Sequence, residues 1–202
     1  MVLQHVVGLL FHPRREWEAI RSERCTVSGC YLRHVVPLAA VPPVCAYVGA
    51  TAVGWSVAGG DPVRMTAASA LPLAVAFYVA LLAGVYIMGR AIHWMAGTYG
   101  ARADLGTCVV LAAYTAVPLF LAGIAALWPQ PWLMMLVGLA AVGYAVYLFY
   151  TGVPVMMGIS REQGFLMASA ALTVGLVLLV GMLAVTVLLW GLGLAPVFTP
   201  GG

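Results

Sequence analysis

Five long runs of apolar residues follow the first 33 residues of the chain, and short polar segments separate them. A helix needs roughly 20 residues to cross a hydrocarbon core about 30 Å thick, and every run is long enough. None of the runs contains Asp or Glu. The pattern predicts an all-α fold, a polytopic membrane helical bundle with five transmembrane helices. Their approximate bounds are residues 34–56, 70–96, 106–128, 132–157 and 164–195.

The first 33 residues have a different pattern, in which an apolar segment gives way to charge. Residues 2–11 are too few to span a bilayer, and Pro13 is expected to separate two short helices. Apolar residues at helical spacing beside Arg and Glu are typical of a helix that lies in the membrane interface. We predict a cytoplasmic amphipathic arm over residues 1–33 and a five-span transmembrane domain over residues 34–202. The arm residues expected at the membrane surface are Arg14, Arg15, Trp17, Arg21 and Arg24.

The composition excludes a soluble domain. Hydrophobic residues make up 64% of the 202 residues and charged residues only 7%, too few to cover a surface that faces water. The net charge is +3, all nine basic residues are Arg, and five of them lie in the arm. Because no basic surface extends beyond the arm, nucleic acid is not an expected partner. The phospholipid bilayer, with its anionic headgroups, is the expected partner.

The positions of the Arg residues predict the orientation, because short loops that carry Arg stay in the cytoplasm. The arm, Arg90, Arg102 and Arg161 would lie on one side of the membrane, and Arg64 would lie on the other. An odd number of spans also places the two termini on opposite sides. We therefore expect a cytoplasmic N-terminus and a C-terminus on the far side of the membrane.

A pair of polar residues near the end of the second run is a candidate site. Arg90 and His93 are three residues apart, so they share one helix face, and a charge within a span marks a site by default. Together with Arg102 and Asp104 they form a candidate site for a lipid headgroup or a polar network, and a simple interface anchor is the alternative. His34 and His93 are expected on the same side, which leaves an intramembrane enzyme or redox subunit as a third interpretation.

The sequence lacks the motifs that would indicate a reaction. It contains no HExxH, no GxSxG and no phosphate-binding glycine loop, and its four Cys include no CxxC pair. We expect no catalytic residue, no metal and no cofactor. Free thiols are expected at Cys25, Cys30, Cys45 and Cys108.

Small residues and prolines within the runs bear on how the helices pack. Ala46, Ala50 and Gly54 allow close approach of a second helix, either within the bundle or in a homo-oligomer or heteromeric membrane complex. Pro42 and Pro118 predict kinks in the first and third helices. Such kinks either shape the bundle or open a groove for lipid.

Two stretches, AYTAVP at residues 113–118 and VYLFYTGVP at residues 146–154, resemble the Yip (Rab/Ypt-interacting protein) family in its bacterial branch. The stretch GLLFHP at residues 8–13 extends the similarity into the arm. The resemblance implies a multi-pass protein of the bacterial inner membrane, with a cytoplasmic N-terminus and a periplasmic C-terminus. It brings no established activity, and the Rab partners of eukaryotic members are not expected of so short an arm. The family signature positions are Tyr114, Pro118, Tyr147, Gly152 and Pro154.

Two functional hypotheses follow. The first is a non-enzymatic inner-membrane protein that organises lipid or protein partners as a scaffold or accessory subunit, based on the small-residue faces, the basic arm and the lack of catalytic motifs. The alternative is passive handling of lipid, or transport of a small solute, through a groove between the kinked helices with Arg90 near a headgroup.

Overall fold

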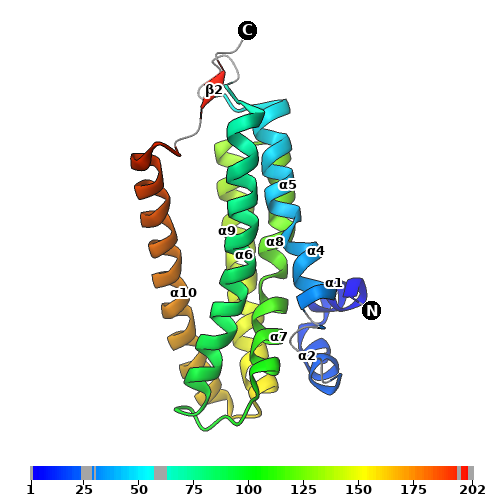
Figure 1. Ribbon diagram of the computed structural model, residues 1–202. Coiled ribbons are helices and arrows are strands. Elements are labelled where there is room, and N and C mark those ends of the chain that lie inside the picture. Colours follow the sequence, from blue (N-terminus) through cyan, green and yellow to red (C-terminus); the bar gives the residue numbers. More distant parts are fainter. Residues whose placement is uncertain (1, 24–28, 30, 57–62, 195–196, 200–202) are drawn as a thin grey trace.

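The computed structural model describes residues 2–23, 29, 31–56, 63–194 and 197–199, which form a helical bundle with the arm packed against one side (Figure 1). Arg24, Cys25 and Cys30 lie outside the described residues. The all-α polytopic membrane bundle is confirmed, because five helical segments are long and apolar enough to cross a membrane. These segments are Tyr31–Val53, Ala67–Ala96, Leu105–Leu127, Pro131–Met157 and Arg161–Leu188.

The first membrane-spanning segment is a series of short helices rather than one continuous helix. The interruption at Ala40 comes two residues before Pro42 and Pro43, which lack the N–H groups that would continue the helical hydrogen bonds. The hydroxyl of Tyr78 donates a hydrogen bond to the carbonyl of Val36 at 3.0 Å and so satisfies one group of the interrupted helix. The pieces are the π-helical turn η1 (Tyr31–Val35), α4 (Val36–Ala39), α5 (Val41–Val48) and the π-helical turn η2 (Gly49–Val53).

The third segment is also interrupted, and it packs directly against the first. It consists of α7 (Leu105–Thr115), α8 (Val117–Ala122) and the 3-10 turn η3 (Gly123–Leu127). A side chain at Gly123 would come within 2.6 Å of Pro42, and one at Gly49 would collide with the carbonyl of Ala126. Closely packed backbone lies between the two kinks, where a lipid groove was one of the two alternatives.

The remaining three segments are single long helices. They are α6 (Ala67–Ala96), α9 (Pro131–Met157) and α10 (Arg161–Leu189), which runs into the π-helical turn η4 (Trp190–Leu194). The hydroxyls of Thr66 and Ser160 cap the first turns of α6 and α10 by accepting hydrogen bonds from backbone N–H groups. Gly158 ends α9 with φ at 67°, in the left-handed region that glycine enters without strain.

A pair of short strands fastens the end of the chain to the loop that precedes α6. β1 (Arg64–Met65) pairs in antiparallel fashion with β2 (Phe198–Thr199), at the end of the bundle drawn uppermost in Figure 1. The N–H of Val197 also donates to the hydroxyl of Ser69 at 3.0 Å. The hydropathy pattern did not predict this connection.

The arm forms two helices that separate at Pro13, as the sequence predicts. α1 (Val2–Phe11) and α2 (Pro13–Ser22) meet at His12, and Pro13 opens α2 at a position that needs no N–H donor. α1 packs against α2, and α2 packs against α9 beside the lower half of the bundle in Figure 1. Four apolar side chains of the arm are buried: Val6, Leu9, Trp17 and Ile20.

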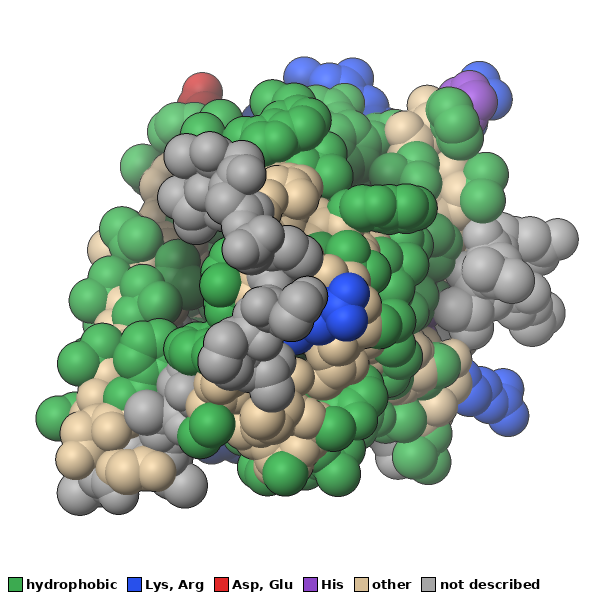
Figure 2. Space-filling view, turned by 90° about the horizontal axis from the view of Figure 1, so that it is seen from above, with side chains coloured by type: hydrophobic (Ala, Val, Ile, Leu, Met, Phe, Trp, Pro, Cys, Tyr) green, Lys and Arg blue, Asp and Glu red, His purple; other side chains and the backbone are tan. Residues whose placement is uncertain are grey.

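The outer surface of the bundle is apolar. The third segment forms the centre of the bundle. In its most apolar stretch 56% of the residues are buried, whereas only 6% are buried in the corresponding stretches of α6 and α10. Large hydrophobic side chains are exposed along α6, α9 and α10. Figure 2 shows the end that holds the strands, where hydrophobic side chains also cover much of the face and charged ones are few. Such a surface is suited to lipid rather than water.

Candidate functional site

Tyr114 on α7 is the centre of a buried cluster of rings that joins the arm to the bundle. The His34 ring lies against it with 4.1 Å between ring centroids, and the rings of His5 and Trp17 meet it edge to face at 5.9 and 6.5 Å. The four residues come from α7, η1, α1 and α2, and none is more than 9% exposed. We call His5, Trp17, His34 and Tyr114 the arm junction.

Trp17 holds α2 against α9 because Gly152 leaves space for its indole ring. Trp17 is fully buried, and a side chain at Gly152 would come within 2.7 Å of the ring. An aromatic side chain of this kind buries roughly 150–250 Å². Protein rather than lipid or water therefore surrounds the Trp17 ring. An amphipathic pattern identifies an apolar face, but it does not reveal whether lipid or protein covers that face.

His5 links the two arm helices through two carboxylates. Its Nδ1 contacts Glu16, and its Nε2 lies 3.1 Å from a carboxylate oxygen of Glu23. Each ring nitrogen of His5 thus faces a carboxylate oxygen, and the two contacts hold α1 against α2. A side chain at Gly8 would collide with Glu16, which accounts for a glycine on this face of α1. Both of these contacts between a basic and an acidic side chain are centred on His5.

Polar contacts also satisfy backbone carbonyls where α1 and α9 end. The hydroxyl of Tyr144 lies 2.9 Å from the carbonyl oxygens of both Leu9 and Leu10, and Arg21 donates to the carbonyl of Val155 at 2.8 Å. The last four carbonyls of a helix lack partners within it, and an unpaired carbonyl in lipid is costly. Arg21, which was expected at the membrane surface, thus binds the end of α9.

Four buried polar atoms in or next to the arm junction have no hydrogen-bond partner among the described residues. They are both ring nitrogens of His34, Nε1 of Trp17 and Oγ1 of Thr115. His34 is only 1% exposed. Leaving a buried polar group unpaired costs about 1–3 kcal/mol, so these atoms are a departure from the packing of the rest of the bundle.

The two arm helices differ on their outward faces. Val7, Leu10 and Phe11 on α1 are 53%, 37% and 73% exposed, and their spacing places them on one face of the helix. Arg14 and Arg15 at the start of α2 are also exposed. An apolar face next to basic side chains is typical of contact with a bilayer interface.

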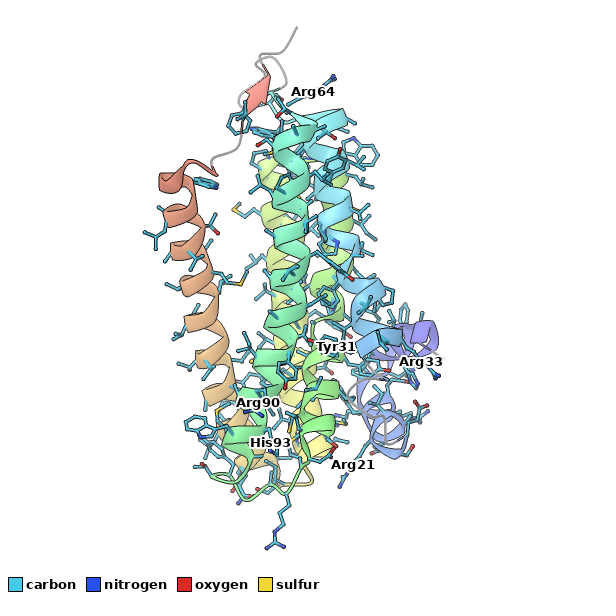
Figure 3. The ribbon with its side chains drawn as sticks, in the orientation of Figure 1. Arg21, Tyr31, Arg33, Arg64, Arg90 and His93 are labelled. Atoms are coloured by element: carbon cyan, nitrogen blue, oxygen red, sulfur yellow. The ribbon has the colours of Figure 1, made fainter. Side chains whose placement is uncertain are left out.

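The structure does not assemble the polar network that was considered around Arg90. Arg90, His93, Arg102 and Asp104 are all exposed, and among the described residues neither Arg forms an ion pair. Figure 3 places Arg90 and His93 toward one end of α6 and Arg64 beyond the other end. The exposure favours the interface-anchor interpretation over a buried network.

His93 and Asp104 each bond a near neighbour instead. Nδ1 of His93 lies 3.1 Å from the carbonyl oxygen of Ala103, and the hydroxyl of Thr107 donates to Asp104 at 2.5 Å. This hydroxyl lowers the pKa of Asp104 below its usual value. The buried His34 and the exposed His93 belong to separate places, and within the described residues no group of three or more His, Cys, Asp or Glu is placed to hold a metal ion.

The five family signature positions have different surroundings. Tyr114 is the centre of the arm junction, and Gly152 lines it. Pro118 lies in the first turn of α8, directly after the kink in the third segment. Pro154 packs against the start of α10, whereas Tyr147 is 47% exposed. Two of the five positions, Tyr114 and Gly152, therefore contact the arm.

The sequence analysis missed the association of His5, His34, Glu16 and Glu23. These residues come from different segments, and no spacing rule connects a buried His of a membrane span with a carboxylate of the arm. The available signal was the family-like stretch at residues 8–13, which begins at the glycine that makes room for Glu16.

Comparisons with known proteins identify the family of the chain. The Yip1 domain model matches residues 7–182, a range that includes the arm helix α2, the first four membrane-spanning segments and most of the fifth. The chain is 44% identical over 191 residues to the inner membrane protein YohC of Escherichia coli K12. The aligned residues cover 95% of this chain and 98% of that protein. YohC of Escherichia coli O6:H1 matches to the same extent. No solved structure matches the chain. The chain thus belongs to the Yip family and is a multi-pass inner-membrane protein.

Proposed function

We propose that the protein is a non-enzymatic scaffold or accessory subunit that organises lipid or protein partners in the inner membrane. One observation carries the proposal: α6, α9 and α10 present large apolar side chains outward, while the buried polar groups lie under the arm. In a membrane, apolar helix faces bind lipids and neighbouring helices. The proposed partners are therefore phospholipids and other membrane helices, in a homo-oligomer or a heteromeric complex.

The test is extraction of the protein into native-lipid nanodiscs, followed by mass spectrometry of everything that accompanies it. A stoichiometric protein partner or a defined homo-oligomer is expected. A monomer with only bulk lipid would contradict the proposal.

Two matched variants identify the face that a partner uses. Gly84 on α6 and Gly143 on α9 both have open space where a side chain would be added. Gly84→Trp and Gly143→Trp should leave the bundle folded and each block one outer face. We expect one of the two to release the partner and the other to retain it.

The proposed orientation has the arm in the cytoplasm and the C-terminus in the periplasm. Arg21, Arg90 and His93 lie toward one end of the bundle and Arg64 lies toward the other (Figure 3), and Arg-rich ends of membrane proteins stay cytoplasmic. In this orientation Arg14 and Arg15 meet headgroups and Phe11 enters lipid. Fusion of alkaline phosphatase to the C-terminus should give an active enzyme, because this reporter folds only in the periplasm, and an inactive but intact fusion would reverse the assignment.

Passive lipid handling is the second candidate, and α10 is the observation that favours it. Gly175 lies against α6, because a Cβ added there would be 3.4 Å from the terminal methyl group of Met88. By contrast, every residue described between Leu176 and Leu188 is exposed. A helix surrounded by lipid along half its length offers a boundary along which lipids can move. Scrambling of labelled lipid in liposomes that contain the protein should exceed the rate in empty liposomes, and equal rates would remove this candidate.

A further inference from the structure

We infer that the arm junction is a binding site for water, which donates and accepts the missing hydrogen bonds of His34, Trp17 and Thr115 beneath the arm. The inference rests on the four buried atoms that lack a partner among the described residues. Buried polar groups in native proteins are nearly always hydrogen-bonded, either to protein or to ordered water. Four such atoms in or beside one cluster indicate that ordered water supplies their missing hydrogen bonds.

The chemistry of these atoms limits what the molecule can be. The indole N–H of Trp17 only donates, a neutral imidazole at His34 donates from one nitrogen and accepts at the other, and the hydroxyl of Thr115 does both. An ionised carboxylate or a phosphodiester cannot donate, and a metal cation or ammonium cannot accept. A neutral hydroxyl does both, and it avoids the cost of burying an unpaired charge.

The closure of the site limits the size of the molecule. Trp17 is fully buried and His34 is 1% exposed, so no extended ligand reaches these atoms while the arm is in place. A water molecule typically makes about three hydrogen bonds in a buried site, which suits a set of several unpaired groups. Water is therefore the hydroxyl compound that fits the closed arm junction.

The arm is what closes the site. Trp17 both contributes a donor and fills the space at Gly152, while Tyr144 holds the end of α1 through the carbonyls of Leu9 and Leu10. The arm thus docks on the bundle through a dry aromatic contact and a hydrated polar one.

The test is nuclear magnetic resonance of the full-length protein, labelled with 15N-histidine, in nanodiscs of phosphatidylcholine. This lipid has no hydroxyl group, so a hydroxyl contact to the ring must come from water. His34 is assigned by comparison with His34→Phe, and the exposed His93 serves as a positive control for exchange with bulk water. We expect a cross-peak between the His34 ring N–H and water. Its absence, with the His93 cross-peak present, would overturn the inference.

A second lipid composition distinguishes the two sources of a hydroxyl group. Nanodiscs of phosphatidylglycerol supply a headgroup that carries hydroxyls. If water fills the site, the His34 signals should be the same in both lipids. A hydroxyl contact that appears only with phosphatidylglycerol would assign the site to a headgroup and overturn the assignment to water.

The thermal stability of His34→Phe gives an independent readout. If the arm junction is dry, the change removes two unpaired polar atoms and should raise Tm. If water satisfies the ring, the change removes real hydrogen bonds and should lower Tm. His12→Phe, at an exposed position between the arm helices, is the control and should leave Tm unchanged.

Discussion

The arm junction and the outer half of α10 are both built from apolar sequence that belongs to a membrane protein, yet protein covers the first and lipid is left to cover the second. Trp17 and Leu9 are fully buried against the bundle, whereas Leu183 and Leu188 of α10 are 60% and 67% exposed. Hydropathy therefore predicts that a segment avoids water, but it does not predict what replaces water around it.

What distinguishes the arm junction is matched shape and matched polarity. Gly152 makes room for Trp17, Gly8 makes room for Glu16, and Tyr144 satisfies carbonyls at the end of α1. In the outer half of α10, an added side chain at Gly181 would meet nothing. Close packing rather than apolarity is what joins helices in a membrane, and the two regions illustrate its presence and its absence.

Removing the central side chain of the arm junction should have the largest effect. Trp17→Ala should lower the free energy of unfolding by about 3–5 kcal/mol, as expected for loss of a buried aromatic ring. Trp94→Ala is the matched control, because Trp94 is 79% exposed and its loss should cost less than about 0.5 kcal/mol. Chemical denaturation of the purified protein in detergent measures both. Equal losses would mean that the arm contributes no more than a lipid-facing residue.

Filling the space that receives the arm should have the next largest effect. Gly152→Leu places a side chain where the Trp17 ring lies, so we expect a loss of about 1–3 kcal/mol from overpacking. Gly143→Leu adds the same group to the same helix in open space and should be neutral or slightly stabilising. The same denaturation experiment compares them. A tolerated Gly152→Leu would show that Trp17 can leave its place without cost.

A single polar contact should matter less than either. Tyr144→Phe removes the hydroxyl that binds the carbonyls of Leu9 and Leu10, and we expect a loss of about 1 kcal/mol. The loss should be local, so limited proteolysis of the arm should become faster while the bundle remains intact. Tyr147→Phe, at a half-exposed position on the same helix, is the control. Equal rates of cleavage in the two variants would show that the Tyr144 hydroxyl does not hold the arm against the bundle.

The smallest effect is expected outside both regions, at the exposed start of α7. Because the pKa of Asp104 is lowered in the folded protein, its contribution to stability is complete above the usual pKa of an aspartate and is lost as the pH falls through the lower folded value. Solvent screening keeps this contribution below about 0.5 kcal/mol. Thr107→Val removes the responsible hydroxyl. The free energy of unfolding of this variant should therefore depend less on pH in the range where carboxylates titrate, roughly pH 5 to 2. An identical pH dependence in the variant would show that the Thr107 hydroxyl has no such role.

The parts of the fold that follow from local physics could be predicted from the sequence. Run length gave the five spans, and Pro13, Pro42 and Pro118 marked the interruptions because each lacks an N–H donor. The partner of Trp17 could not be predicted, because Gly152 lies on another helix far along the chain. The same limit explains why Arg90 looked like part of a network: its spacing from His93 is local information, whereas its exposure depends on which helices pack beside α6.

The strand pair has a mechanical consequence for α10. One end of this helix is held by packing on Pro154 and by the hydrogen bond between Tyr150 and Ser169 at 2.9 Å. The chain after its other end is fastened by β2 to β1 and by Val197 to Ser69. Between these two attachments, the described residues from Leu176 to Leu188 are exposed. The lateral pressure of the bilayer would therefore act on this exposed half of α10, while the contacts at both ends hold the helix in place.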